Sequence, residues 1–206
     1  SADELDPALS EGGSKPAHNP RVSSGLGVIP RVVANGRAIY RGKISMREAH
    51  GRLRDHWRPY HDQLHALLNS ALTQFGEAIL IDCHSMPHEA LDAVVHPHGI
   101  RPEIVLGDRF GAAARGDIMD RIEAAFVDAG LAVVRNAPFA GAYTTQHYGR
   151  PSRGQHVIQV EIDRSLYMNE KTIRPSAHFP DFKEVIDRVV ADIAAVGRSE
   201  LPLAAE

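Results

Sequence analysis

The chain has 206 residues, of which 43% are hydrophobic and 24% charged, and its net charge is −3. These values are typical of one soluble globular domain, and the lack of a strongly basic stretch argues against nucleic acid as a partner, because phosphate binding requires clustered lysine and arginine. No apolar run approaches the ~18 residues that span a bilayer and the start is polar, so we expect a cytoplasmic protein with no membrane partner.

Residues 1–24 mix proline, glycine, serine and charged residues without hydrophobic periodicity. This pattern predicts a loop-like lead-in to a single domain that covers residues 1–206. A β-branched run at residues 28–34 is followed by the turn signal Asn35-Gly36 and then by residues 38–40, so we expect a hairpin there.

The clearest predicted helix starts at Ser45, because Ser45 and Glu48 have the spacing of a capping box. Apolar residues then recur at steps of three or four, which predicts one buried helix face. That face comprises Met46, Ala49, Leu53, Trp57, Tyr60, Leu64, Leu67 and Ala71. Pro59 lies inside the pattern and cannot donate a backbone hydrogen bond, so we expect a kink or a break.

The rest of the chain alternates predicted strands with predicted helices. Residues 78–83 are apolar apart from Asp82, as expected of a strand covered on both faces. Further strands are predicted at residues 104–106, 131–135 and 157–162, and helices at residues 117–130 and 182–196. This order indicates an α/β fold: a three-layer sandwich with a central, mostly parallel mixed sheet.

Two polar clusters follow or interrupt these strands. Asp82 and His84 come directly after an apolar run, where burial costs several kcal/mol unless each group finds a partner. Glu161 and Asp163 flank one apolar residue and therefore point the same way from a strand. A carboxylate in a dry pocket can act as a general base. The alternatives are a structural histidine at position 84 and two acids on a solvated face.

A third candidate is the stretch of residues 136–153, which has no periodicity. Connections of this length are usually functional or disordered. Its glycine and aromatic content favours an ordered, functional loop.

Taken together, short motifs spread in order over residues 20–170 resemble the N-formylglutamate amidohydrolase family. These motifs are Gly27-Val28-Ile29-Pro30-Arg31, Ile39-Tyr40-Arg41-Gly42-Lys43, Arg58-Pro59-Tyr60-His61, Ile81-Asp82-Cys83-His84-Ser85-Met86-Pro87, Val105-Leu106-Gly107-Asp108, Asn136-Ala137-Pro138-Phe139, Gly141-Ala142-Tyr143-Thr144-Thr145, Tyr148-Gly149 and Gln155-His156-Val157-Ile158-Gln159-Val160-Glu161-Ile162. The resemblance implies the phosphorylase/hydrolase-like fold of zinc carboxypeptidases and aspartoacylase-like deacylases. It also implies hydrolysis of N-formyl-L-glutamate or a close N-acyl amino acid, as in histidine degradation.

The same resemblance implies roles for particular residues. His84 matches a zinc ligand, and Glu161 matches the glutamate that activates water. Zinc, or another divalent metal, would lower the pKa of bound water and polarise the acyl carbonyl. Arginine can grip carboxylates with two hydrogen bonds. The candidates for substrate contacts are Arg31, Arg41 and Arg150 for carboxylates, and Asn136, Tyr143, Thr144 and His147 for the pocket wall or an oxyanion.

The sequence departs from the family pattern in its metal ligands. The family's other two zinc ligands, a His and a Glu three residues later, have no counterpart, because no His-x-x-Glu occurs in the chain. Nothing in residues 1–24 matches the family's first strand and metal loop, so we expect both to be absent from this sequence. Either the full protein contains them, or it is a shortened homologue with an incomplete site. The competing functions are a non-catalytic carboxylate-binding domain and a related zinc amidase or peptidase.

Overall fold

The computed structural model describes residues 10–11, 23–25, 27–33, 36–92, 99 and 101–197. They belong to two compact units, Ser1–Ala66 and Leu67–Glu206, whose boundary lies inside helix α3 (Arg58–Phe75). A single domain that covers residues 1–206 stays a prediction. None of the helices within the described residues is both long and apolar enough to cross a membrane.

The first unit contains a short two-stranded sheet and the predicted capped helix. Strand β1 (Ser10–Glu11) pairs in parallel with β2 (Ile44–Ser45), and α2 (Met46–Arg52) follows. The Ser45 hydroxyl accepts a hydrogen bond from the Glu48 amide at 3.2 Å, which confirms the predicted helix start. The predicted hairpin is reduced to one antiparallel bridge between Val32 and Ala38, and Asn35 of its turn lies outside the described residues.

The predicted irregularity near Pro59 takes the form of a π-helical turn. Helix α2 passes into η3 (Leu53–Trp57), where the Arg58 amide bonds to the Leu53 carbonyl, and α3 continues from there. This wider turn lies next to the proline, whose ring nitrogen has no hydrogen to donate. The prediction of one buried face is wrong, because Tyr60 is 57% and Leu67 58% exposed. Periodicity shows which side chains share a face, but not what packs on it.

The second unit is built around a four-stranded sheet with the order β3-β6-β4-β5. The strands are β3 (Ala78–Met86), β4 (Ile104–Gly107), β5 (Val133–Arg135) and β6 (Gln155–Asp163). β3 pairs in parallel with β6 and β4 with β5, whereas β4 and β6 are antiparallel. The prediction of an α/β fold with a mixed, mostly parallel sheet is confirmed. The prediction that β3 is covered on both faces is wrong, because Cys83 and His84, which point to opposite faces of the strand, are both exposed. A run of apolar residues does not show what packs on either face.

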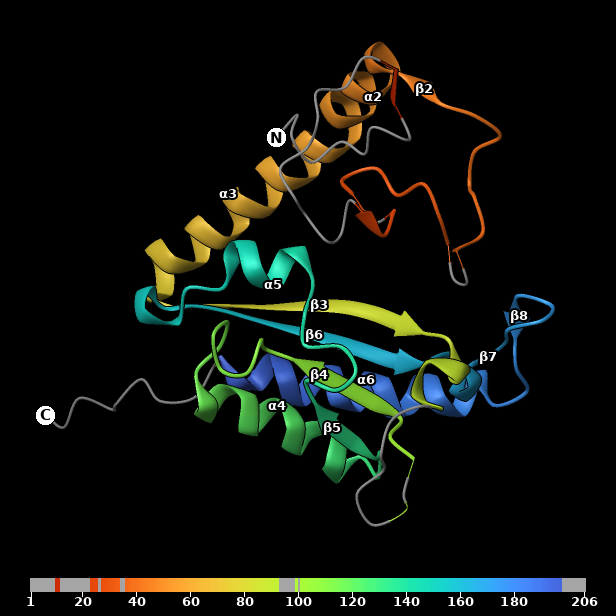
Figure 1. Ribbon diagram of the computed structural model, residues 1–206. Coiled ribbons are helices and arrows are strands. Elements are labelled where there is room, and N and C mark those ends of the chain that lie inside the picture. The colour runs from red at the N-terminus through yellow and green to blue at the C-terminus, as the bar shows by residue number, and fades with distance from the viewer. Residues whose placement is uncertain are drawn as a thin grey trace, which may run out of the picture. The chain divides into compact units, whose positions relative to one another are not determined.

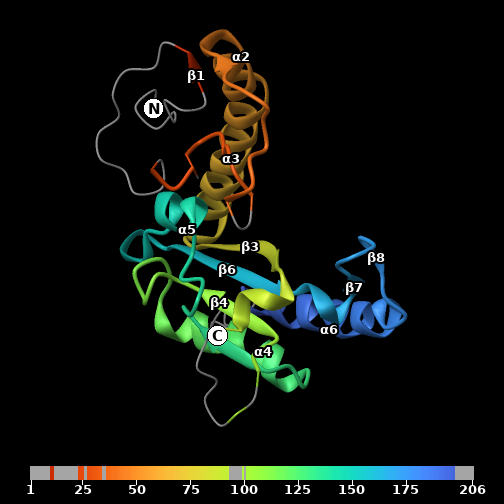
Figure 2. The same cartoon turned by 45° about the vertical axis from the view of Figure 1, so that its right-hand side comes forward.

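Helices α4 (Gly116–Asp128) and α6 (Phe179–Val196) lie together on one face of this sheet (Figure 1). The view turned by 45° shows the same arrangement, with α5 (Tyr143–Tyr148) on the opposite side (Figure 2). Ile104, Leu106 and Ile158 are fully buried between the sheet and the two helices. Burying such a side chain contributes roughly 1.5–3 kcal/mol, so this face holds the main core.

Short elements complete the unit. They are η4 (His88–Leu91), η6 (Pro151–Arg153), η7 (Arg164–Leu166), β7 (Met168–Asn169) and β8 (Arg174–Pro175). The stretch of residues 136–153 is ordered, as predicted. It is not a loop throughout, because it contains helix α5. η4 and η7 directly follow the ends of β3 and β6, the two strands that carry the polar residues.

Candidate functional site

The face of the sheet opposite α4 and α6 carries a cluster of polar side chains from two neighbouring strands. In the parallel register, Asp82 pairs with Gln159, His84 with Glu161 and Met86 with Asp163. Val105 and Gly107 of β4 lie beside Glu161 and Gln159. Because side chains alternate along a strand, all these residues point to one face. The register therefore brings His84 and Glu161, the two residues predicted to carry the chemistry, side by side.

His84 lies between two carboxylates. Its Nε2 is 3.1 Å from Asp82 Oδ1, and its Nδ1 is 3.9 Å from Glu161 Oε1. The hydrogen bond to Asp82 raises the pKa of His84 above its ordinary value, since the carboxylate stabilises the imidazolium. The other Asp82 oxygen, Oδ2, is buried and has no hydrogen-bond partner within the described part of the chain. The imidazole itself is 42% exposed, so one side of it faces outward.

Glu161 is only 8% exposed and Asp163 only 3%, so the alternative that both acids lie on a solvated face is wrong. Burial raises the pKa of Glu161, because a carboxylate loses its hydration there. His84 and a hydrogen bond from Gln159, at 2.9 Å from Nε2 to Glu161 Oε1, act in the opposite direction. A buried carboxylate whose pKa is raised is suited to accept and return a proton.

The segment after β5 packs closely against this face. A Cβ atom on Gly107 would lie 2.7 Å from the backbone of Ala140 and Gly141, so β4 needs glycine at this position. Asn136 is held within the protein: its side-chain amide donates to Asp108 Oδ1 at 2.8 Å and its oxygen accepts from the Asp108 backbone amide at 3.1 Å. These contacts fix the start of the segment. A substrate contact by Asn136 stays a prediction.

The predicted pocket residues of α5 are connected with one another. Tyr143 stacks on His147 with ring centroids 4.9 Å apart, and the Tyr143 hydroxyl is 3.3 Å from His147 Nδ1. Thr144 is half-buried next to them. Arg150 donates to the carbonyls of Gln146 and Gly149 at the end of the helix, at 3.0 and 2.5 Å.

Arg31 and Arg41 belong to the first unit. The substrate roles of Tyr143, Thr144, His147 and the three arginines stay predictions.

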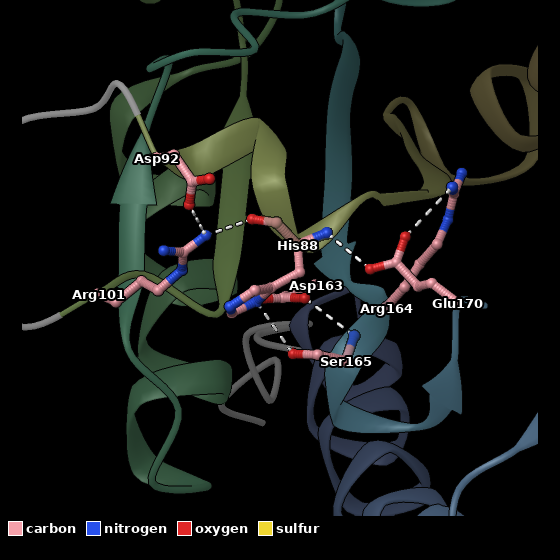
Figure 3. Close-up of polar contacts among 7 residues, drawn as sticks. All are labelled: His88, Asp92, Arg101, Asp163, Arg164, Ser165 and Glu170. Atoms are coloured by element: carbon pink, nitrogen blue, oxygen red, sulfur yellow. Dashed lines mark hydrogen bonds and ion pairs between the residues drawn. The ribbon is translucent and has the colours of Figure 1, made fainter. Parts of the chain in front are cut away.

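Sequence reasoning missed a polar network at the carboxyl ends of β3 and β6 (Figure 3). Asp163 Oδ2 lies 2.7 Å from His88 Nδ1, and the Ser165 hydroxyl lies 3.1 Å from the same nitrogen. The His88 amide donates to Glu170 at 2.8 Å, while Arg101 bonds the His88 carbonyl and Asp92. The network ties η4 to η7. The buried acid two residues beyond Glu161 is the signal that could have revealed it.

The expected zinc site stays a prediction. Catalytic zinc is usually held by three protein ligands. Within the described residues, no three histidine, cysteine, aspartate or glutamate side chains form a group that could hold a metal ion. Among the described residues His84 therefore supplies one imidazole ligand, and they do not complete a three-ligand site.

Comparisons with known proteins agree with the motifs. A family model described as N-formylglutamate amidohydrolase matches residues 1–168. N-formylglutamate deformylases of Pseudomonas aeruginosa and Pseudomonas putida are 31% and 32% identical to this chain over 173 and 150 residues. These alignments cover 81% and 70% of this chain, but it spans only 62% and 54% of the relatives' lengths.

Two solved structures also resemble the chain. The crystal structure of N-formylglutamate amidohydrolase from Ralstonia eutropha has a TM-score of 0.82 at 29% identity, covering 95% of this chain and 70% of that one. A gene product of Agrobacterium tumefaciens has a TM-score of 0.51 at 15% identity, covering 81% of this chain and 62% of that one. At such low identity the second structure supports the fold alone.

Proposed function

Because the chain belongs to the N-formylglutamate amidohydrolase family, we propose that it hydrolyses the amide of N-formyl-L-glutamate or a close N-acyl amino acid. The products are formate, or the corresponding acid, and the free amino acid. The proposed setting is histidine catabolism in the cytoplasm, with a small-molecule N-acyl amino acid as the partner.

The observation that carries this proposal is the buried Glu161 beside His84. Glu161 Oε1 is held by Gln159, which leaves Oε2 to accept a proton from an attacking water. The same carboxyl group then passes the proton to the leaving nitrogen of the amide. Since burial raises its pKa, the group is a stronger base than an exposed glutamate and returns the proton within a dry site.

We include zinc in the proposal as the metal of the full-length protein. His84 is the imidazole ligand that the described residues offer. When bound, zinc supplies Lewis acidity toward the acyl carbonyl and lowers the pKa of a bound water. The proton transfers above are assigned to Glu161 alone, because the described residues do not form a complete site.

The proposed substrate contacts come from arginine and from α5. Arg31, Arg41 and Arg150 suit the two carboxylates of an acylated glutamate, since guanidinium groups bind carboxylates with two parallel hydrogen bonds. Asn136, Tyr143, Thr144 and His147 would line the pocket or donate to the developing oxyanion.

The test is formate release from N-formyl-L-glutamate by the purified full-length protein, together with its metal content. We expect turnover and bound zinc, both of which are lost in His84→Ala. Metal-free protein that shows no turnover after zinc is added would exclude the enzyme.

A second candidate is a non-catalytic carboxylate-binding domain, which the lack of a three-ligand group among the described residues favours. Isothermal titration with N-formyl-L-glutamate distinguishes the two. The second candidate predicts binding with no formate released.

A further inference from the structure

Gln159 is a buried amide whose two ends contact different parts of the site. It is 4% exposed and lies on β6, two residues before Glu161. Its Nε2 donates to Glu161 Oε1 at 2.9 Å, and its Oε1 accepts from the Ala142 amide at 2.7 Å. Both bonds fix the side chain, since exchanging the amide nitrogen and oxygen would break both. Gln159 therefore connects Glu161 directly to the segment that precedes α5.

The segment that Gln159 holds is itself fixed. Ala142 immediately precedes α5, and its carbonyl accepts from the Thr145 hydroxyl at 2.7 Å. Gly107, the register partner of Gln159, has no side chain and lets residues 139–141 approach β4. A displacement of Gln159 would thus be felt both at Glu161 and at the first turn of α5, which carries Tyr143 and Thr144.

We propose that Gln159 is a positioning residue that fixes the Glu161 carboxylate and couples it to the substrate-facing segment of residues 142–148. The inference rests on the proposed function, because it assigns Glu161 as the base. A carboxamide is neither an acid nor a base near neutral pH, so Gln159 does not carry the proton itself. Its N–H group holds Glu161 Oε1, and its oxygen holds the Ala142 amide at the start of α5.

Two substitutions separate the two ends of Gln159. Gln159→Glu keeps an oxygen for the Ala142 amide but replaces the donor to Glu161 with a second carboxylate. Gln159→Met has similar length and removes both hydrogen bonds. Gln155→Glu is the matched control, because it makes the same charge change on the same face of β6 roughly 20 Å from Glu161.

The first readout is the crystal structure of each folded variant of the full-length protein, which gives the positions of the Glu161 carboxylate and the Ala142 amide. We expect the carboxylate to leave its wild-type position in both Gln159 variants and to stay in place in Gln155→Glu, because both Gln159 variants remove the donor to Glu161 Oε1. The second readout is the split between kcat and KM for N-formyl-L-glutamate. The kcat should fall about tenfold in both Gln159 variants, and KM should rise more in Gln159→Met, which also releases Ala142.

A Glu161 carboxylate that keeps its wild-type position in folded Gln159→Glu would overturn the inference. If the wild-type protein hydrolyses N-formyl-L-glutamate but the carboxylate does not move in the variant, the positioning role fails and the proposed function stands. If the carboxylate moves but no wild-type turnover occurs, the hydrogen-bond role of Gln159 stands and the proposed function fails. Should Gln159→Met not fold, Gln159→Glu still decides, because it retains the contact with Ala142.

Discussion

The two faces of the central sheet use the same strands for opposite purposes. Along β6, Ile158 and Val160 point into the core with α4 and α6, whereas Gln159 and Glu161 point to the opposite face. The first face gains free energy from apolar burial, but the second places carboxylates in a partly dry environment, at a cost. Alternate residues of one strand therefore serve stability and chemistry. Substitutions one position apart should mainly change the free energy of unfolding on the first face and kcat on the second.

The largest expected effect is on the polar face. Glu161→Gln should lower kcat for formate release by roughly 10²–10⁴-fold, the usual contribution of a general base. The free energy of unfolding should stay equal or rise at neutral pH. Since the folded pKa of Glu161 is raised, ionisation at higher pH weakens the native state, and glutamine removes that cost. Glu184→Gln, an exposed position on α6, is the control that should change neither quantity.

On the apolar face, a substitution should lower stability and leave kcat almost unchanged. Ile158→Ala should lower the free energy of unfolding by about 2–5 kcal/mol, because Ile158 is fully buried and the cavity fills poorly. Urea denaturation gives this value. The kcat of the folded fraction should remain close to wild type. A large fall in kcat at full folding would break the division between the faces.

The polar face should contribute to stability only where its groups are paired. Asp163 Oδ2 contacts His88 and Oδ1 accepts from the Ser165 amide at 2.9 Å, so both oxygens accept. Asp163→Asn loses one acceptor and should cost about 1–3 kcal/mol in urea denaturation. Asp120→Asn, an exposed carboxylate on α4, should cost less than about 1 kcal/mol. Equal costs for the two variants would contradict a structural role of the network in Figure 3.

The smallest effect concerns His84. Asp82 raises the pKa of His84, so the stabilisation from this pair is present at low pH and is lost as pH rises through the folded pKa. Asp82→Asn should move the NMR titration midpoint of His84 to lower pH. A His84 midpoint that stays in place would mean that the Asp82 contact is not formed in solution.

The elements with long periodic patterns could be predicted from the sequence. β3, β6, α4 and α6 were found because their apolar residues repeat over many positions. α5 was missed because it has only six residues and no side-chain cap at its start. The buried face assigned to residues 46–71 was wrong for Tyr60 and Leu67, since the pattern cannot show what covers a helix.

The candidate site, too, could be predicted from the sequence only in part. The proximity of His84 and Glu161 depends on the register between β3 and β6, which alternation alone does not give. The pairing of Asp108 with Asn136 depends on where a loop returns to the sheet. Gln159 carried one usable signal, since it shares a strand face with Glu161 and Asp163, but its contact with Ala142 required the fold.

The most direct test of the central claim is the pH dependence of kcat/KM for N-formyl-L-glutamate in wild type and in Glu161→Gln. We expect wild-type kcat/KM to rise with pH along an acidic limb, because the base must be ionised. The midpoint of this limb should lie above the ordinary pKa of glutamate, because burial raises the pKa of Glu161. The residual activity of Glu161→Gln should lack this limb. The same limb and the same rate in Glu161→Gln would show that another group is the base and would contradict the account.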